Sequence, residues 1–158
     1  LANIDTMLKS IEWCDPNDDY DRFCEINKIN DKRRALVIFC VNLMKRGLIP
    51  LKRIEDMIID LETRFFDSLD KEGSTSINEE LSELMAALII KSSDPSHLSD
   101  PNDKKKWLQT WCAKPCIEEY ATRVSKLKAK DHVGLSNKAV FKHMDMRDAL
   151  AKLNCETN

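Results

Sequence analysis

Apolar residues recur at helical spacing through most of this 158-residue chain, and this periodicity constrains its fold more than any other feature. Between Pro50 and Gly73 the apolar side chains follow one another at steps of three, one, three, four and four residues, which places them on one face of an α-helix. No segment has the alternation of apolar and polar residues, or the enrichment in β-branched residues, that is typical of strands. The sequence therefore predicts an all-α protein, and its length suits a single domain over residues 1–158.

Capping residues set the expected boundaries in the first part of the chain. The first helix is expected to end near Trp13, and the acidic, turn-rich segment 14–30 is interpreted as a loop. Asp31 can accept hydrogen bonds from the free amides of the next helix, whose core positions include Phe39. Gly47 is expected to stop that helix.

The same reasoning places the next two helices. Pro50 suits the first turn of the third helix, where its missing amide hydrogen costs nothing. Ser76 and Glu79 have the three-residue spacing of a capping box and are expected to begin the fourth helix. A polar linker is expected over residues 92–103.

Pro115 decides how the last third of the chain is divided. A proline costs about 3 kcal/mol inside a helix and nothing at its start, so Pro115 is predicted to begin a helix. Trp107 and Trp111 lie one turn apart on a short helix before it. The final helix, capped by Ser136, is expected to bury Phe141. Six substantial helices joined as hairpins can form a bundle or a solenoid, and periodicity alone does not choose between them.

The sequence contains no Gly-rich phosphate loop, nucleophile elbow, HExxH or EF-hand pattern. The six cysteines and three histidines have no zinc-ligand spacing, and reduced thiols of a cytosolic protein are expected. His143, with Asp145 and Asp148, is expected on a solvated helix face, where no nucleophile accompanies it. No run of eighteen apolar residues and no signal peptide is present. The chain is predicted to be a non-enzymatic cytoplasmic protein without membrane attachment, metal or cofactor.

The two parts of the chain have opposite charge. Residues 1–100 carry 13 Lys and Arg against 20 Asp and Glu, whereas residues 101–152 carry 12 against 6. With Trp107 and Trp111 nearby, the basic residues of the second part could bind RNA phosphates and stack bases. The alternative is a solvated face with the tryptophans in the core. The candidate RNA-binding residues are Lys104, Lys105, Lys106, Arg123, Lys126, Lys128 and Lys130.

Four segments, in order, resemble the middle domain of eukaryotic translation initiation factor 4G. They are DKRRALVIFCVNLMKRGLIPLKRIEDMI (31–58), INEELSELMAALI, AKPCIEEYATRVSKLKAK and SNKAVFKHMDMRDAL. The matching positions include Arg33, Arg34, Phe39 and Lys45 in the first segment, Pro115 and Tyr120 in the third, and Phe141, Asp145 and Asp148 in the last. The resemblance covers roughly residues 31–153. It implies a crescent of about three HEAT-type helix pairs, the later repeats of such a domain.

The resemblance also implies a function. Members of this family are non-catalytic scaffolds that bind the DEAD-box RNA helicase of translation initiation, initiation factor 4A, and orient its two lobes. The matching polar residues Arg33, Arg34, Lys138, Asp145 and Asp148 are the expected partner contacts, in a monomer within a larger initiation complex that also holds mRNA. An RNA-binding or mRNA-processing or decay scaffold of the same family, and a purely structural bundle, are the alternative hypotheses.

Overall fold

The computed structural model describes residues 2–156 and contains helices but no strands over that range, which confirms the predicted all-α class. Seven α-helices and one short 3-10 helix follow one another along the described chain. Their bounds are α1 (Ala2–Lys9), α2 (Tyr20–Lys45), α3 (Leu51–Asp67), α4 (Thr75–Ser93), α5 (Pro101–Trp111), α6 (Pro115–Val124), η1 (Ala129–Asp131) and α7 (Asn137–Glu156).

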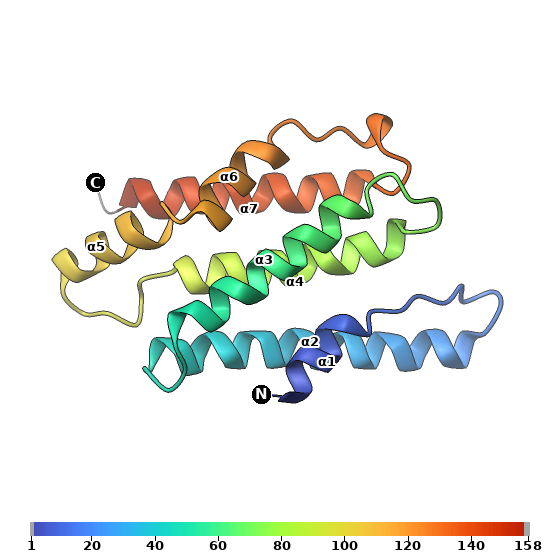
Figure 1. The fold of residues 1–158 in the computed structure, drawn as a ribbon, viewed down its shortest axis with the longest axis horizontal. Helices are drawn as coiled ribbons and strands as arrows, with labels where there is room; N and C mark the ends of the chain where they lie inside the picture. The colour runs from blue at the N-terminus through green and yellow to red at the C-terminus, as the bar shows by residue number, and fades with distance from the viewer. Residues whose placement is uncertain (1, 157–158) are drawn as a thin grey trace.

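The helices form two layers, and α4 is the central helix of one of them (Figure 1). α2, α4 and α7 lie side by side in one layer, and α1, α3 and α6 cross over them in the second. α4 contacts α2, α3 and α7, so it is covered on several sides. This position explains why α4 buries residues around much of its circumference, including Leu81, Leu84, Met85, Leu88 and Ile89.

Several predicted boundaries are confirmed. Pro115 is the first residue of α6, and the Ser136 hydroxyl accepts a hydrogen bond from the Ala139 amide at the start of α7. Gly47 follows α2 with a φ of 72°, a left-handed conformation that ends the helix without the steric cost of a side chain. α4 ends at Ser93.

The interpretation of segment 14–30 as a loop is wrong from residue 20 onward. α2 begins at Tyr20 because the Asp19 carboxylate accepts a hydrogen bond from the Arg22 amide at 3.0 Å. Asp31, the expected cap, therefore lies in the interior of α2. Ile26 is buried in this part of α2, although the acidic composition of the segment had indicated a loop.

Smaller differences occur at three other boundaries. α1 ends at Lys9 rather than near Trp13. α4 begins at Thr75, one residue before the predicted cap Ser76. The connection between α4 and α5 covers only residues 94–100 of the predicted linker 92–103, because the Asp100 carboxylate caps α5 and Pro101 is its first residue.

The burial of two phenylalanines and one histidine was predicted wrongly. Phe39 and Phe141 are 55% and 61% exposed, because each lies on the side of its helix that faces away from the core. His143 is only 1% exposed instead of solvated. The apolar stripes of α2 and α7 are thus wider than the faces that those helices bury.

A chain of hydrogen bonds satisfies His143 inside the core. The Ser82 hydroxyl donates to the Asn78 carbonyl at 2.7 Å, so its oxygen accepts from His143 Nε2 at 2.8 Å. His143 Nδ1 is then the acceptor for the Tyr120 hydroxyl. Burial lowers the pKa of His143 to about 4, which keeps the imidazole neutral. These contacts tie α4, α6 and α7 together and account for His143 as a core residue.

Candidate partner-binding surface

The exposed face of α7 combines hydrophobic and acidic side chains. Phe141, Met144, Asp145 and Asp148 follow at the i, i+3, i+4 and i+7 spacing that places residues on one face of a helix. Phe141 and Met144 are 61% and 40% exposed, while the opposite face of α7 buries Met146. We refer to Phe141, Met144, Asp145 and Asp148 as the α7 surface.

The two carboxylates of the α7 surface are available to a partner. Asp148 lies 3.5 Å from the guanidinium of its neighbour Arg147, but its side chain is 72% exposed. Asp145 forms no ion pair with any residue that the structure describes. An exposed aromatic ring beside two solvated carboxylates suits a partner surface that has an apolar hollow with basic residues around it.

Lys138 and Arg34 lie at a separate place, over the amino-terminal part of α4. Lys138 is 3.6 Å from Glu79, and the Arg34 guanidinium binds Glu80. Both side chains line one pocket of about 200 Å³ that also contains Glu83. The structure therefore brings together these two predicted contact residues from α2 and α7, but each is already paired with a glutamate of α4.

Arg33 is not a surface residue, and its prediction as a partner contact is wrong. It lies within α2 rather than near a turn, and it is 1% exposed. Its guanidinium donates to the Met7 carbonyl at 2.6 Å and to the Ser10 carbonyl at 3.2 Å, and it lies 3.9 Å from Glu80. Burial lowers the pKa of Arg33, and Glu80 opposes that effect. Arg33 thus attaches the end of α1 to α2 and α4.

The predicted RNA-binding residues do not form one patch. Lys104, Lys105 and Lys106 lie on α5, whereas Lys126, Lys128 and Lys130 follow α6. Figure 1 places these two groups at opposite ends of the molecule. Arg123, on the last turn of α6, stacks its guanidinium 3.5 Å from the centre of the Phe66 ring.

The two tryptophans of α5 are held by the protein itself. The rings of Trp107 and Trp111 stack on each other with centroids 5.7 Å apart. The Trp107 indole donates to the Ser92 carbonyl and the Trp111 indole to the Ser92 hydroxyl, both at 3.0 Å. Trp111 is only 1% exposed. The alternative in which the tryptophans belong to the core is therefore correct for Trp111, whereas Trp107 is partly buried and has one ring face stacked on Trp111.

The part of the chain that the structure describes contains neither a metal-binding cluster nor a membrane-spanning helix. No cluster of three or more histidine, cysteine or acidic side chains within residues 2–156 could hold a metal ion. None of the described helices combines the length and the apolar character needed to cross a membrane.

No protein-family model, curated protein or solved structure matches this chain. The resemblance to the middle domain of initiation factor 4G therefore rests on the four sequence segments described above.

Proposed function

We propose that this chain is a non-catalytic scaffold domain that binds a DEAD-box RNA helicase of the initiation factor 4A type through the α7 surface. The observation that carries the proposal is the position of Phe141, 61% exposed, on the same helical face as Asp145 and Asp148. An exposed large aromatic residue beside exposed carboxylates has the composition of a binding hot spot. All three residues lie in the segment that resembles the closing helix of the family.

The arrangement of the helices supports the same proposal. The consecutive helices α1 and α2, α3 and α4, and α6 and α7 each contribute one member to each of the two layers (Figure 1). We interpret this arrangement as three HEAT-type helix pairs stacked side by side. Such a stack could hold two helicase lobes near their closed arrangement, which would remove part of the ordering cost before ATP and RNA bind.

An RNA-binding scaffold is the less favoured alternative. The basic residues are divided between two ends of the molecule, and the tryptophans that would have stacked bases are engaged with Ser92. Binding of a protein partner accounts for the exposed aromatic and acidic side chains of the α7 surface, and we therefore favour it over RNA binding. We place the chain in the cytoplasm, where translation initiation takes place, as part of this proposal.

Stimulation of helicase ATPase activity tests the proposal. The chain should stimulate a purified helicase of the initiation factor 4A type in the presence of RNA. Replacing both carboxylates (Asp145→Lys with Asp148→Lys) should reduce the apparent affinity by about tenfold or more, as expected for close interface charges. The matched control is Asp67→Lys with Glu72→Lys, which changes the net charge equally at exposed positions outside α7.

Two outcomes would contradict the proposal. One is a double reversal in α7 that stimulates the helicase as well as the parent chain. The other is the absence of helicase binding together with tight, strongly salt-dependent binding of a single-stranded RNA oligomer. The second outcome would favour the RNA-binding alternative, because counterion release makes phosphate contacts sensitive to salt.

A further inference from the structure

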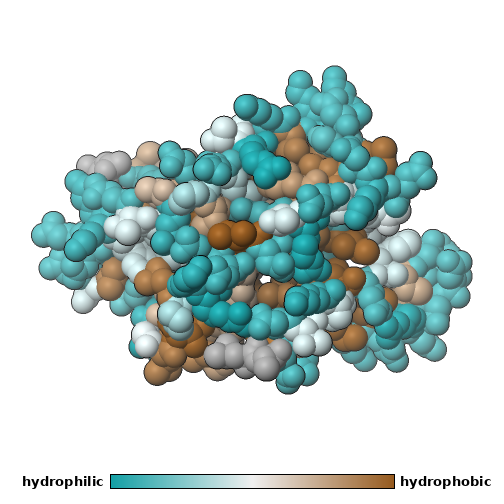
Figure 2. Space-filling view, viewed as in Figure 1, coloured by the Kyte–Doolittle hydropathy of each residue, from teal (hydrophilic) through white to brown (hydrophobic). Residues whose placement is uncertain are grey.

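A second surface lies at the carboxyl end of α2, and α2 and α7 lie on opposite sides of α4 (Figure 1). In Figure 2, hydrophobic residues gather at the lower left of the molecule, where α2 ends and α3 begins. A groove of about 720 Å³ is present here, and residues of the α2 end line most of it. We call it the α2 groove.

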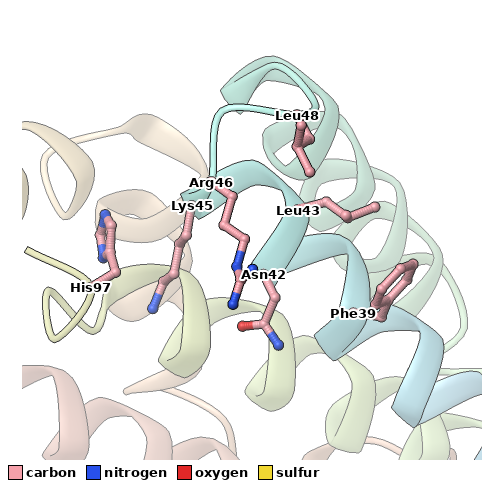
Figure 3. A pocket seen from close by; sticks show the side chains of 7 residues that line it. All are labelled: Phe39, Asn42, Leu43, Lys45, Arg46, Leu48 and His97. Carbon is pink, nitrogen blue, oxygen red and sulfur yellow. The ribbon is translucent and has the colours of Figure 1, made fainter.

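The α2 groove has a hydrophobic side. Phe39, Leu43 and Leu48 line it, and Figure 3 shows the three side chains on one side of the groove. Phe39 is 55% and Leu48 68% exposed, although both are large apolar side chains. Contact with an apolar partner would remove the surface of these side chains from water, which favours binding.

The opposite side of the α2 groove is basic. Lys45 and Arg46 line it together with His97, whose pKa is lowered by burial, and no carboxylate side chain does. The Arg46 side chain makes no ion pair within the described part of the chain, and residue 46 is exposed. Lys45 donates one hydrogen bond to the Asp94 carbonyl at 2.8 Å, which leaves other donors of its ammonium group.

We propose that the α2 groove binds an acidic amphipathic peptide segment of a partner protein. Hydrophobic side chains of that segment would cover Phe39, Leu43 and Leu48, while its carboxylates would pair with Arg46 and Lys45. The positive charge of the groove favours an acidic occupant. A basic or neutral apolar segment would cover the Arg46 guanidinium without offering it a carboxylate partner. The proposal does not depend on helicase binding, because it concerns different residues on a different helix.

Selection from a displayed library of random 12-residue peptides tests this proposal on the full chain. The selected peptides should combine Leu, Phe or Trp with two or more Asp or Glu residues. A labelled peptide from the selection should bind at least tenfold more weakly to Leu48→Asp and to Arg46→Glu. The matched controls are Val133→Asp and Lys71→Glu, which introduce the same charge changes at exposed positions outside the groove and should bind like the parent.

Several results would overturn the proposal. The groove is not the site if no peptide is selected, or if the selected peptides bind the groove variants and the parent equally. Selection of basic peptides would refute the assigned chemistry. Concentration-dependent self-association of the chain that Leu48→Asp abolishes would make a second copy the occupant, and displacement of the peptide by an RNA oligomer would make the basic side an RNA contact. Circular dichroism melting of each variant confirms that loss of binding is not loss of folding.

Discussion

Replacing Arg33 by alanine should destabilise the fold strongly, although the sequence alone suggested a surface contact. The guanidinium is 1% exposed and donates hydrogen bonds to the carbonyls of Met7 and Ser10 and to Asn30. It also lies 3.9 Å from the buried Glu80. Arg33→Ala would remove these contacts together and open a cavity beside the end of α1.

The magnitude follows from the partners that are left behind. Removing one member of a buried ion pair typically costs about 3 to 5 kcal/mol. Because Glu80 keeps the Arg34 guanidinium as a partner, we expect the lower end of that range, about 3 kcal/mol. For a chain of this size each kcal/mol lowers Tm by about 2 to 4 °C, so Tm should fall by about 6 to 12 °C.

Urea unfolding followed by circular dichroism measures this loss. Lys32→Ala is the control, because Lys32 is an exposed neighbour on α2, and its effect should stay within about 0.5 kcal/mol. Amide exchange should also speed up in α1 of Arg33→Ala, since the residue holds the end of that helix. A loss below about 1 kcal/mol, with protection of α1 unchanged, would refute the assigned role of Arg33.

Three further predictions concern other buried positions. Gly134→Ala should lower the free energy of unfolding, measured in urea, by about 1 to 3 kcal/mol, because a Cβ there would lie 2.6 Å from the Ser68 carbonyl oxygen. A stability equal to that of the parent would contradict this packing. Burial raises the pKa of Glu62 from 4.5 to about 8, so between these pH values the folded state holds a proton that the unfolded state releases. The free energy of unfolding should therefore fall as pH rises from about 4.5 to 8. Glu62→Gln should remove this slope and be more stable than the parent at pH 9. Burial lowers the pKa of His143 from 6.5 to about 4, so the contribution of the neutral imidazole to stability is complete above pH 6.5 and should be lost as pH falls towards 4. The same dependence of stability on pH in His143→Gln and the parent would contradict a neutral buried imidazole.

Much of the helical architecture could be predicted from periodicity, prolines and glycines, because these act locally. Pro115 and Gly47 each mark a boundary through their own backbone chemistry, whatever packs around them. The start of α2 was missed because several acidic residues compete as caps. Asp19 takes that role, and the choice of Asp31 shortened the predicted helix.

Burial on α2 and α7 was harder to predict, but the sequence contained a usable signal. The helical neighbours of Phe141 at i+4 and i+7 are Asp145 and Asp148, and Met144 at i+3 is itself 40% exposed, so the ring lies on a partly polar, solvent-facing side of the helix. His143 has Ala139 at i−4, with Met146 and Leu150 at i+3 and i+7, and it is buried among apolar residues.

Arg33 follows the same rule as His143. It has Val37 at i+4 and Cys40 at i+7, and both are buried. Its partners Met7 and Ser10 belong to the first helix and the residue just after it, far away in the sequence, so their contribution could not be predicted before the fold was known. The pairing of Arg34 and Lys138 with glutamates of α4 depends on long-range packing in the same way.

Binding of a purified initiation factor 4A-type helicase to Phe141→Ala, measured by calorimetry, tests the central claim most directly. The ring is 61% exposed, so its removal should change the melting temperature of the isolated chain by no more than about 2 °C. If the α7 surface is the helicase-binding site, Kd should rise by about thirtyfold or more, the loss expected for a hot-spot residue of about 2 kcal/mol. Unchanged affinity of Phe141→Ala for the helicase, with the parent binding normally, would contradict the claim.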